Sequence, residues 1–108
     1  MRQKIQPFIA ILEMVCGLDE KERNRYLRTA DTKFIKFLSE LCFQVIHNTL
    51  ALERDLLLKL KPSRKAIEAL AKKNISMKER RRILTKKNSF SNIFPLLIKR
   101  LIEILHNE

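Results

Sequence analysis

Glycine, proline and tryptophan are scarce in this chain of 108 residues, which has one glycine, three prolines and no tryptophan. β-Hairpins depend on the turn conformations that glycine and proline supply, so this composition disfavours a sheet. Leu, Ile, Lys, Arg and Glu are abundant instead, and this mixture favours helices. The hydrophobic content of 45% is that of a folded chain. We predict one all-α domain, a compact bundle of about five to six short helices.

Cysteine and histidine are also rare, which limits the chemistry open to this chain. Cys16 and Cys42 lie among apolar residues, a setting typical of reduced core thiols. Two cysteines and two histidines show no metal-ligand spacing, and there is no Gly-rich phosphate loop or carboxylate cluster. We read His47 as a structural or surface residue. The sequence therefore predicts no enzyme, no metal and no cofactor.

Long hydrophobic runs are absent as well. No stretch reaches the roughly 18 uncharged apolar residues that would span a membrane. The apolar N-terminal run is interrupted by Glu13, and no small-residue cleavage site follows it. We therefore expect an intracellular protein, placed in a virion interior or a host nucleus if it is viral.

Positive charge is concentrated in residues 59–87. This segment holds twelve Lys or Arg against Glu68 and Glu79, a net charge of +10, whereas the whole chain carries +11. The remaining residues are therefore nearly neutral. Such a concentration is typical of a polyanion-binding element. We divide the domain into a neutral helical core (1–58), a basic helical pair (59–87) and an amphipathic C-terminal helix (88–108).

Apolar periodicity and capping signals place the helices. Asp19 and Ser76 each begin a D/S-x-x-E capping pattern, and Thr32 is expected to cap the central helix. Pro62 should break the chain between two helices, and Pro95 suits the first turn of the last helix. The charged residues of the second helix, including Arg23, resemble a solvated face. The expected helices cover about 5–17, 19–29, 32–48, 50–60, 63–73, 77–87 and 95–106.

The basic segment predicts binding to phosphates with little reading of sequence. All seven aromatic residues lie outside 59–87, and single-stranded nucleic acid is usually bound by stacking on aromatic rings. We therefore expect duplex DNA to be favoured. If about six to eight cations contact phosphates, a plot of the logarithm of the binding constant against the logarithm of the salt concentration should have a slope of about −5 to −7. The candidate residues are Arg64, Lys65, Lys72, Lys73, Lys78, Arg80, Arg81, Arg82, Lys86 and Lys87.

The last helix has a wide apolar face that must be buried. Its partner could be the core of this domain, a second copy of the chain, or a membrane surface. The second reading of function is therefore a membrane-active or scaffold virion protein, with anionic lipid or an acidic capsid protein as its partner. The face consists of Phe94, Leu97, Ile98, Leu101, Ile102 and Leu105.

From Phe34 onward, about two thirds of the chain resembles the small basic proteins encoded by adenovirus-related elements of the polinton and adintovirus type. The matching stretches are FIKFLSELCFQVIHNTLAL, IEALAKKNISMKERRRIL and KKNSFSNIFPLLIKRLIEIL. Asn88-Ser89 replaces a Gly-Gly pair of the family pattern. The resemblance implies a virion core protein that packs with the genome. The basic positions of its motif correspond to Lys72, Lys73, Lys78, Arg80, Arg81 and Arg82.

Overall fold

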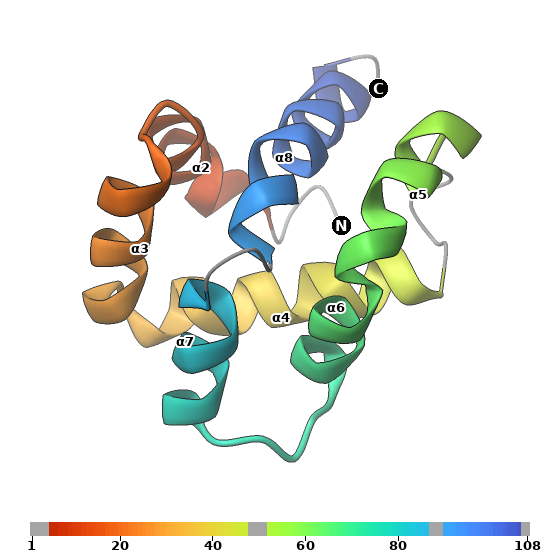
Figure 1. The fold of residues 1–108 in the computed structure, drawn as a ribbon. Coiled ribbons are helices and arrows are strands. Elements are labelled where there is room, and N and C mark those ends of the chain that lie inside the picture. Colours follow the sequence, from red (N-terminus) through yellow and green to blue (C-terminus); the bar gives the residue numbers. More distant parts are fainter. Residues whose placement is uncertain (1–4, 48–51, 87–89, 107–108) are drawn as a thin grey trace.

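The chain is all-α, as predicted. The computed structural model describes residues 5–47, 52–86 and 90–106, with the backbone alone at 90–92 and 104–106 (Figure 1). α5 continues through the 3-10 turn η2 into α6, so the described residues form six separate helical units with no strand. The elements are η1 (Gln6–Phe8), α2 (Ile9–Cys16), α3 (Glu20–Thr29), α4 (Thr32–Ile46), α5 (Arg54–Leu60), η2 (Lys61–Ser63), α6 (Arg64–Ala71), α7 (Met77–Thr85) and α8 (Phe90–His106).

Helix α4 crosses the middle of the molecule, and the other helices pack around it (Figure 1). α2 and α3 lie at one end, α5 and α6 at the other. α8 lies on the upper side, against α2, α3 and α5. α7 lies on the lower side, where it contacts α3, α4, α6 and α8. The two basic helices, α6 and α7, both lie in the lower part of this view and contact each other.

The core draws on all three predicted segments. α4 supplies a continuous buried face from Phe34 to Val45. The basic helices contribute two buried residues each, Ile67 and Leu70 from α6, and Ile83 and Leu84 from α7. Because these apolar residues are interspersed among the cations, the basic segment is folded onto the core.

Two of the three expected helix caps are confirmed. The Asp19 carboxylate accepts a hydrogen bond from the Glu22 N–H at 2.8 Å, and the Ser76 hydroxyl accepts one from the Glu79 N–H at 3.1 Å. The cap of α4 was predicted one residue too late. Asp31 caps this helix by accepting from the Lys33 N–H at 2.7 Å, because a carboxylate serves this position better than a threonine hydroxyl.

The prolines disturb the helices less than expected. Pro62 does not separate α5 from α6; it lies in η2, whose tighter turn joins them. Pro95 is not in the first turn of α8, because this helix begins at Phe90. Proline inside a helix removes one backbone hydrogen bond. Burial of the neighbouring Phe94 and Leu97 offsets that loss.

Most of the predicted apolar face of α8 packs within this chain. Phe94, Leu97, Ile98 and Leu101 are buried, and Ile102 packs against the core while half-buried. The side chain of Leu105 lies outside the described residues. No helix in the described ranges is long and apolar enough to cross a bilayer.

Both thiols are free, and we predict that they react slowly in the native state. Burial raises the pKa of the Cys42 thiol far above its ordinary value, and it also raises the pKa of the half-buried Cys16. Alkylation needs the thiolate. With iodoacetamide near neutral pH, mass spectrometry should show modification of Cys16 before Cys42, and of Cys42 only after urea is added. Rapid native labelling of Cys42 would contradict its placement in the core.

Candidate nucleic-acid interface

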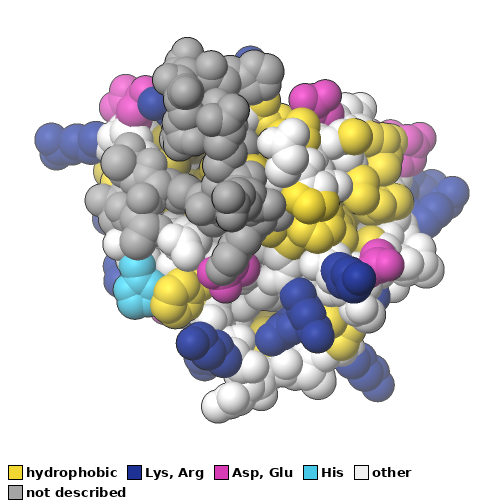
Figure 2. All heavy atoms as spheres, turned by 180° about the vertical axis from the view of Figure 1, so that it is seen from behind, with side chains coloured by type: hydrophobic (Ala, Val, Ile, Leu, Met, Phe, Trp, Pro, Cys, Tyr) yellow, Lys and Arg dark blue, Asp and Glu magenta, His cyan; other side chains and the backbone are white. Residues whose placement is uncertain are grey.

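The structure divides the ten predicted basic residues among several surroundings. Figure 2 shows Lys and Arg side chains across the lower half of the molecule as seen from behind, and others at its upper and side edges. Lys65, Lys78 and Lys86 are exposed. Lys72, Lys73 and Arg80 come together in one surface hollow. Lys87 lies outside the described residues.

This basic hollow has a volume of about 440 Å³ and is lined by parts of three elements. α4 contributes four lining residues, α7 contributes Arg80, and the end of α6 with the two residues after it contributes the rest. Among the described residues, four cations share the space with a single carboxylate, that of Glu40, which accepts a hydrogen bond from the Gln44 amide at 3.3 Å. The net charge of the lining is therefore positive. Its residues are Lys36, Ser39, Glu40, Phe43, Ala71, Lys72, Lys73 and Arg80.

Two buried donors of the basic hollow have no hydrogen-bond partner within the described residues. They are the Ser39 hydroxyl and the Arg80 Nε–H. Ser39 is only 8% exposed. Buried polar groups are nearly always hydrogen-bonded, and one left unpaired costs about 1–3 kcal/mol. Donors left unpaired beside a cluster of cations are suited to an anionic oxygen.

One aromatic residue lies in the hollow although none occurs in the basic segment. Phe43 comes from α4, and sequence reasoning had placed all aromatic rings away from the cations. The Lys73 ammonium lies 5.7 Å from the centroid of the Phe43 ring, and the His47 ring lies 4.3 Å from it. The Phe43 ring is thus already packed by two neighbours. These two neighbours compete with any base for contact with the ring.

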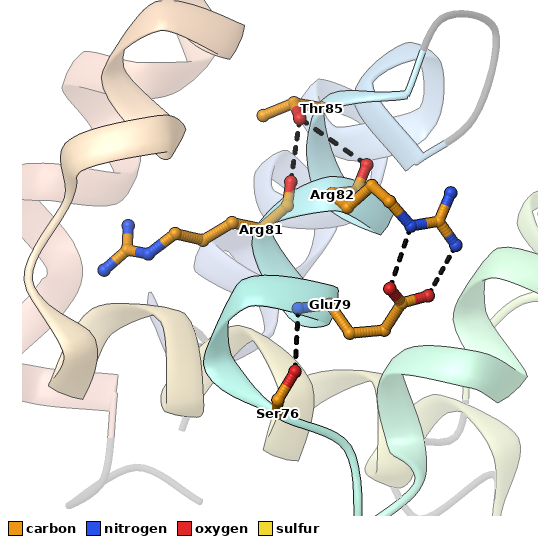
Figure 3. A network of polar contacts seen from close by, with 5 residues as sticks. All are labelled: Ser76, Glu79, Arg81, Arg82 and Thr85. Atoms are coloured by element: carbon orange, nitrogen blue, oxygen red, sulfur yellow. Dashed lines mark hydrogen bonds and ion pairs between the residues drawn. The ribbon is translucent and has the colours of Figure 1, made fainter.

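The three consecutive arginines of α7 point in different directions. A helix turns about 100° per residue, so neighbouring side chains cannot share a face. Arg80 lines the basic hollow, and its Nη2 reaches the Lys73 carbonyl at a long 3.5 Å. Figure 3 shows Arg81 extending away from the paired side chains of Arg82 and Glu79. The phosphate-binding arginines predicted in α7 therefore do not share one surface.

Arg81 joins α7 to the end of α3. Its guanidinium donates to the Leu27 carbonyl at 3.0 Å and to the Ala30 carbonyl at 2.6 Å. The last carbonyls of a helix have no partner inside it, so Arg81 caps α3 from another helix. This residue was predicted to contact phosphate. In the structure its guanidinium is instead hydrogen-bonded to backbone carbonyls of the same chain.

Two further candidate cations already have acidic partners. Arg82 donates through Nε to Glu79 at 2.9 Å and through Nη2 to the other carboxylate oxygen, and these hydrogen bonds lower the pKa of Glu79. Arg64 Nε lies 2.7 Å from Glu68. Both pairs are exposed, so they are weak and a phosphate could compete for either arginine.

A second structural arginine was read as part of a solvated face. Arg23 is only 6% exposed, and it donates to the Leu18 carbonyl at 2.7 Å and to the Val15 carbonyl at 3.3 Å. Its guanidinium also lies 6.0 Å from the centroid of the Phe94 ring. Arg23 thus caps the end of α2 and contacts α8. Its position in a charged helix gave no sign of this role.

Sequence reasoning missed two members of the basic hollow, Lys36 and Ser39. Both belong to α4, which had been assigned to the neutral core. The spacing of Lys36, Ser39 and Phe43 places them on one side of a helix. That signal was present, but it did not indicate that the loop after α6 would lie against this side.

The described residues contain no group of three or more His, Cys, Asp or Glu that could hold a metal ion. Comparison of the chain with protein-family models, with curated proteins and with solved structures finds no match.

Proposed function

We propose that this protein binds nucleic acid through its phosphate backbone, with little dependence on base sequence. The observation that supports this most directly is the basic hollow, which is lined by four cations and includes two buried donors, the Ser39 hydroxyl and the Nε–H of one of those cations, Arg80, that have no partner among the described residues. A phosphate oxygen beside Ser39 would accept from its hydroxyl and from the Arg80 Nε–H. Lys36, Lys72 and Lys73 would neutralise its charge.

Duplex DNA is the favoured ligand. Phosphate contacts fix position on a duplex without reading bases, and the exposed cations Lys65, Lys78 and Lys86 extend the positive surface beyond the hollow. Asn74 is the only amide side chain in the basic segment, so few groups are available to read base edges. The packing of Phe43 by Lys73 and His47 disfavours stacking of single-stranded bases.

The resemblance to basic proteins of adenovirus-related elements extends this proposal to a setting. In that setting the chain condenses or packs a viral genome as a virion core component. Its net charge of +11 on 108 residues suits the partial neutralisation of a packed duplex.

The proposal predicts a steep salt dependence that originates in the basic hollow. With about six phosphate contacts, binding of a fluorescent duplex should weaken with a logarithmic slope of about −5. The triple variant Lys36→Gln, Lys72→Gln, Lys73→Gln should reduce the magnitude of this slope by about two to three. Fluorescence anisotropy over a salt series measures both values.

The matched control removes three exposed cations outside the hollow, in the variant Lys21→Gln, Arg25→Gln, Lys99→Gln. Both triple variants lose the same charge, so long-range attraction falls similarly in the two. Only the hollow variant should lose about two to three units of slope. Equal loss in both would contradict the hollow as the contact site, and a wild-type slope near −1 would overturn nucleic-acid binding itself.

A parallel series separates nucleic acid from other polyanions. Duplex DNA, duplex RNA, single strands and vesicles containing phosphatidylserine should be compared at equal salt. We expect the duplexes to bind more tightly than the single strands, and the vesicles to bind weakly because the apolar face of α8 is buried. Vesicle binding stronger than duplex binding would favour a membrane-surface role instead.

A further inference from the structure

A second surface site lies away from the basic hollow, between the C-terminal part of α4 and the helices α5 and α6. This apolar groove has a volume of about 310 Å³, enough for a few aliphatic side chains. It is lined by Val45, Ile46, Arg54, Leu57, Leu58, Leu60, Lys61, Arg64, Ile67 and Glu68.

Hydrophobic side chains are left exposed along this groove. Leu58 is 57% exposed, and Ile46 and Leu57 are also among the exposed large hydrophobic residues. Single exposed hydrophobic residues are common on protein surfaces and need no explanation. Three of them gathered beside a concave surface are typical of an interaction site. The surface is therefore suited to receive apolar groups from a partner.

The charges at the groove select the kind of partner. Arg54, Lys61 and Arg64 line it against one acid, Glu68, which is paired with Arg64 at 2.7 Å. Within the described residues Arg54 and Lys61 form no ion pair. A second copy of the chain bound at this groove would place the same cations opposite one another, and its net charge is +11. Charge complementarity therefore favours an acidic partner.

We propose that the apolar groove binds an acidic amphipathic protein segment that is helical when bound. Leucine-type side chains at i, i+3, i+4 and i+7 would fill the groove beside Leu57 and Leu58, and flanking Asp or Glu would pair with Arg54 and Lys61. Nucleic acid fits this surface poorly because the exposed side chains of Ile46, Leu57 and Leu58 offer its phosphates no hydrogen-bond donor. The site would let the protein hold a nucleic acid and a protein partner at the same time.

The test uses the full chain and a fluorescent synthetic peptide with leucines at helical spacing and flanking glutamates. Anisotropy should report saturable binding of this peptide, and replacing its glutamates by lysines should abolish it. Leu58→Glu should weaken peptide binding about tenfold or more, since it removes an apolar contact and places a carboxylate beside the glutamates of the peptide. Leu58 is exposed, so the variant should remain folded.

The matched control is Leu96→Glu, which alters a leucine of α8 that is 43% exposed and does not line the groove. It should leave the peptide affinity unchanged, and both variants should bind duplex DNA equally. Lys61→Glu should weaken binding of the glutamate-containing peptide and strengthen binding of the lysine-containing peptide. Failure of the acidic peptide to bind, equal loss in Leu58→Glu and Leu96→Glu, or a dimer in light scattering that Leu58→Glu dissociates would each overturn the proposal.

Discussion

Replacing Phe94 by alanine is expected to lower the free energy of unfolding by about 3–5 kcal/mol. Phe94 is fully buried in α8 and contributes to the same core as α4. Its removal would leave a cavity and would also remove the ring that lies 6.0 Å from the Arg23 guanidinium. For a domain of this size the loss is a large part of the total stability.

Urea unfolding followed by circular dichroism measures this loss as a lower midpoint with an unchanged m-value. Leu96→Ala is the control, because Leu96 is on the same helix and is exposed. It should change the free energy of unfolding by about 0.5 kcal/mol or less. If Phe94→Ala were equally mild, α8 would not belong to the core, and its apolar face would again be available to a membrane or a partner.

Arg81→Met is expected to destabilise the fold by about 2–3 kcal/mol. The substitution keeps an apolar stem of similar length but removes the guanidinium that donates to the Leu27 and Ala30 carbonyls. Hydrogen bonds from charged donors contribute about 1.5–3 kcal/mol, and the carbonyls at the end of α3 would lose their partner. Arg82→Met serves as control, since Arg82 forms only an exposed pair with Glu79.

The same two variants distinguish a structural arginine from a phosphate-binding one. Under conditions where it remains folded, Arg81→Met should keep the salt slope of duplex binding within about one of the wild type. Its unfolding midpoint should still fall well below that of Arg82→Met. If Arg81→Met lost affinity but no stability, Arg81 would be a nucleic-acid contact, contrary to its position between α7 and α3.

Helix positions were the most predictable part of the fold because they depend on short-range patterns. Asp19 and Ser76 cap their helices as predicted, since an N-cap bond reaches only three residues along the chain. The errors at Thr32 and Pro95 came from features that compete locally. Asp31 is a stronger cap than its neighbour, and the packing of Phe94 keeps α8 helical on both sides of a proline.

The candidate site was only partly predictable. Lys72, Lys73 and Arg80 were expected in it, whereas Lys36 and Ser39 come from α4 and meet them only in the folded chain. All three adjacent arginines of α7 were predicted to bind phosphate. They differ because helical rotation turns Arg80 toward α4 and Arg81 toward α3.

The sequence by itself determined that the chain is helical and that its charge is concentrated in residues 59–87. These are consequences of composition, apolar period and local capping, which act within a few residues. Only the tertiary structure decided which cations are available. Packing directs Arg23 and Arg81 into helix ends and buries the face of α8. It also gathers Lys36, Lys72, Lys73 and Arg80 around one hollow, because contacts between distant segments depend on how the helices pack and not on local pattern.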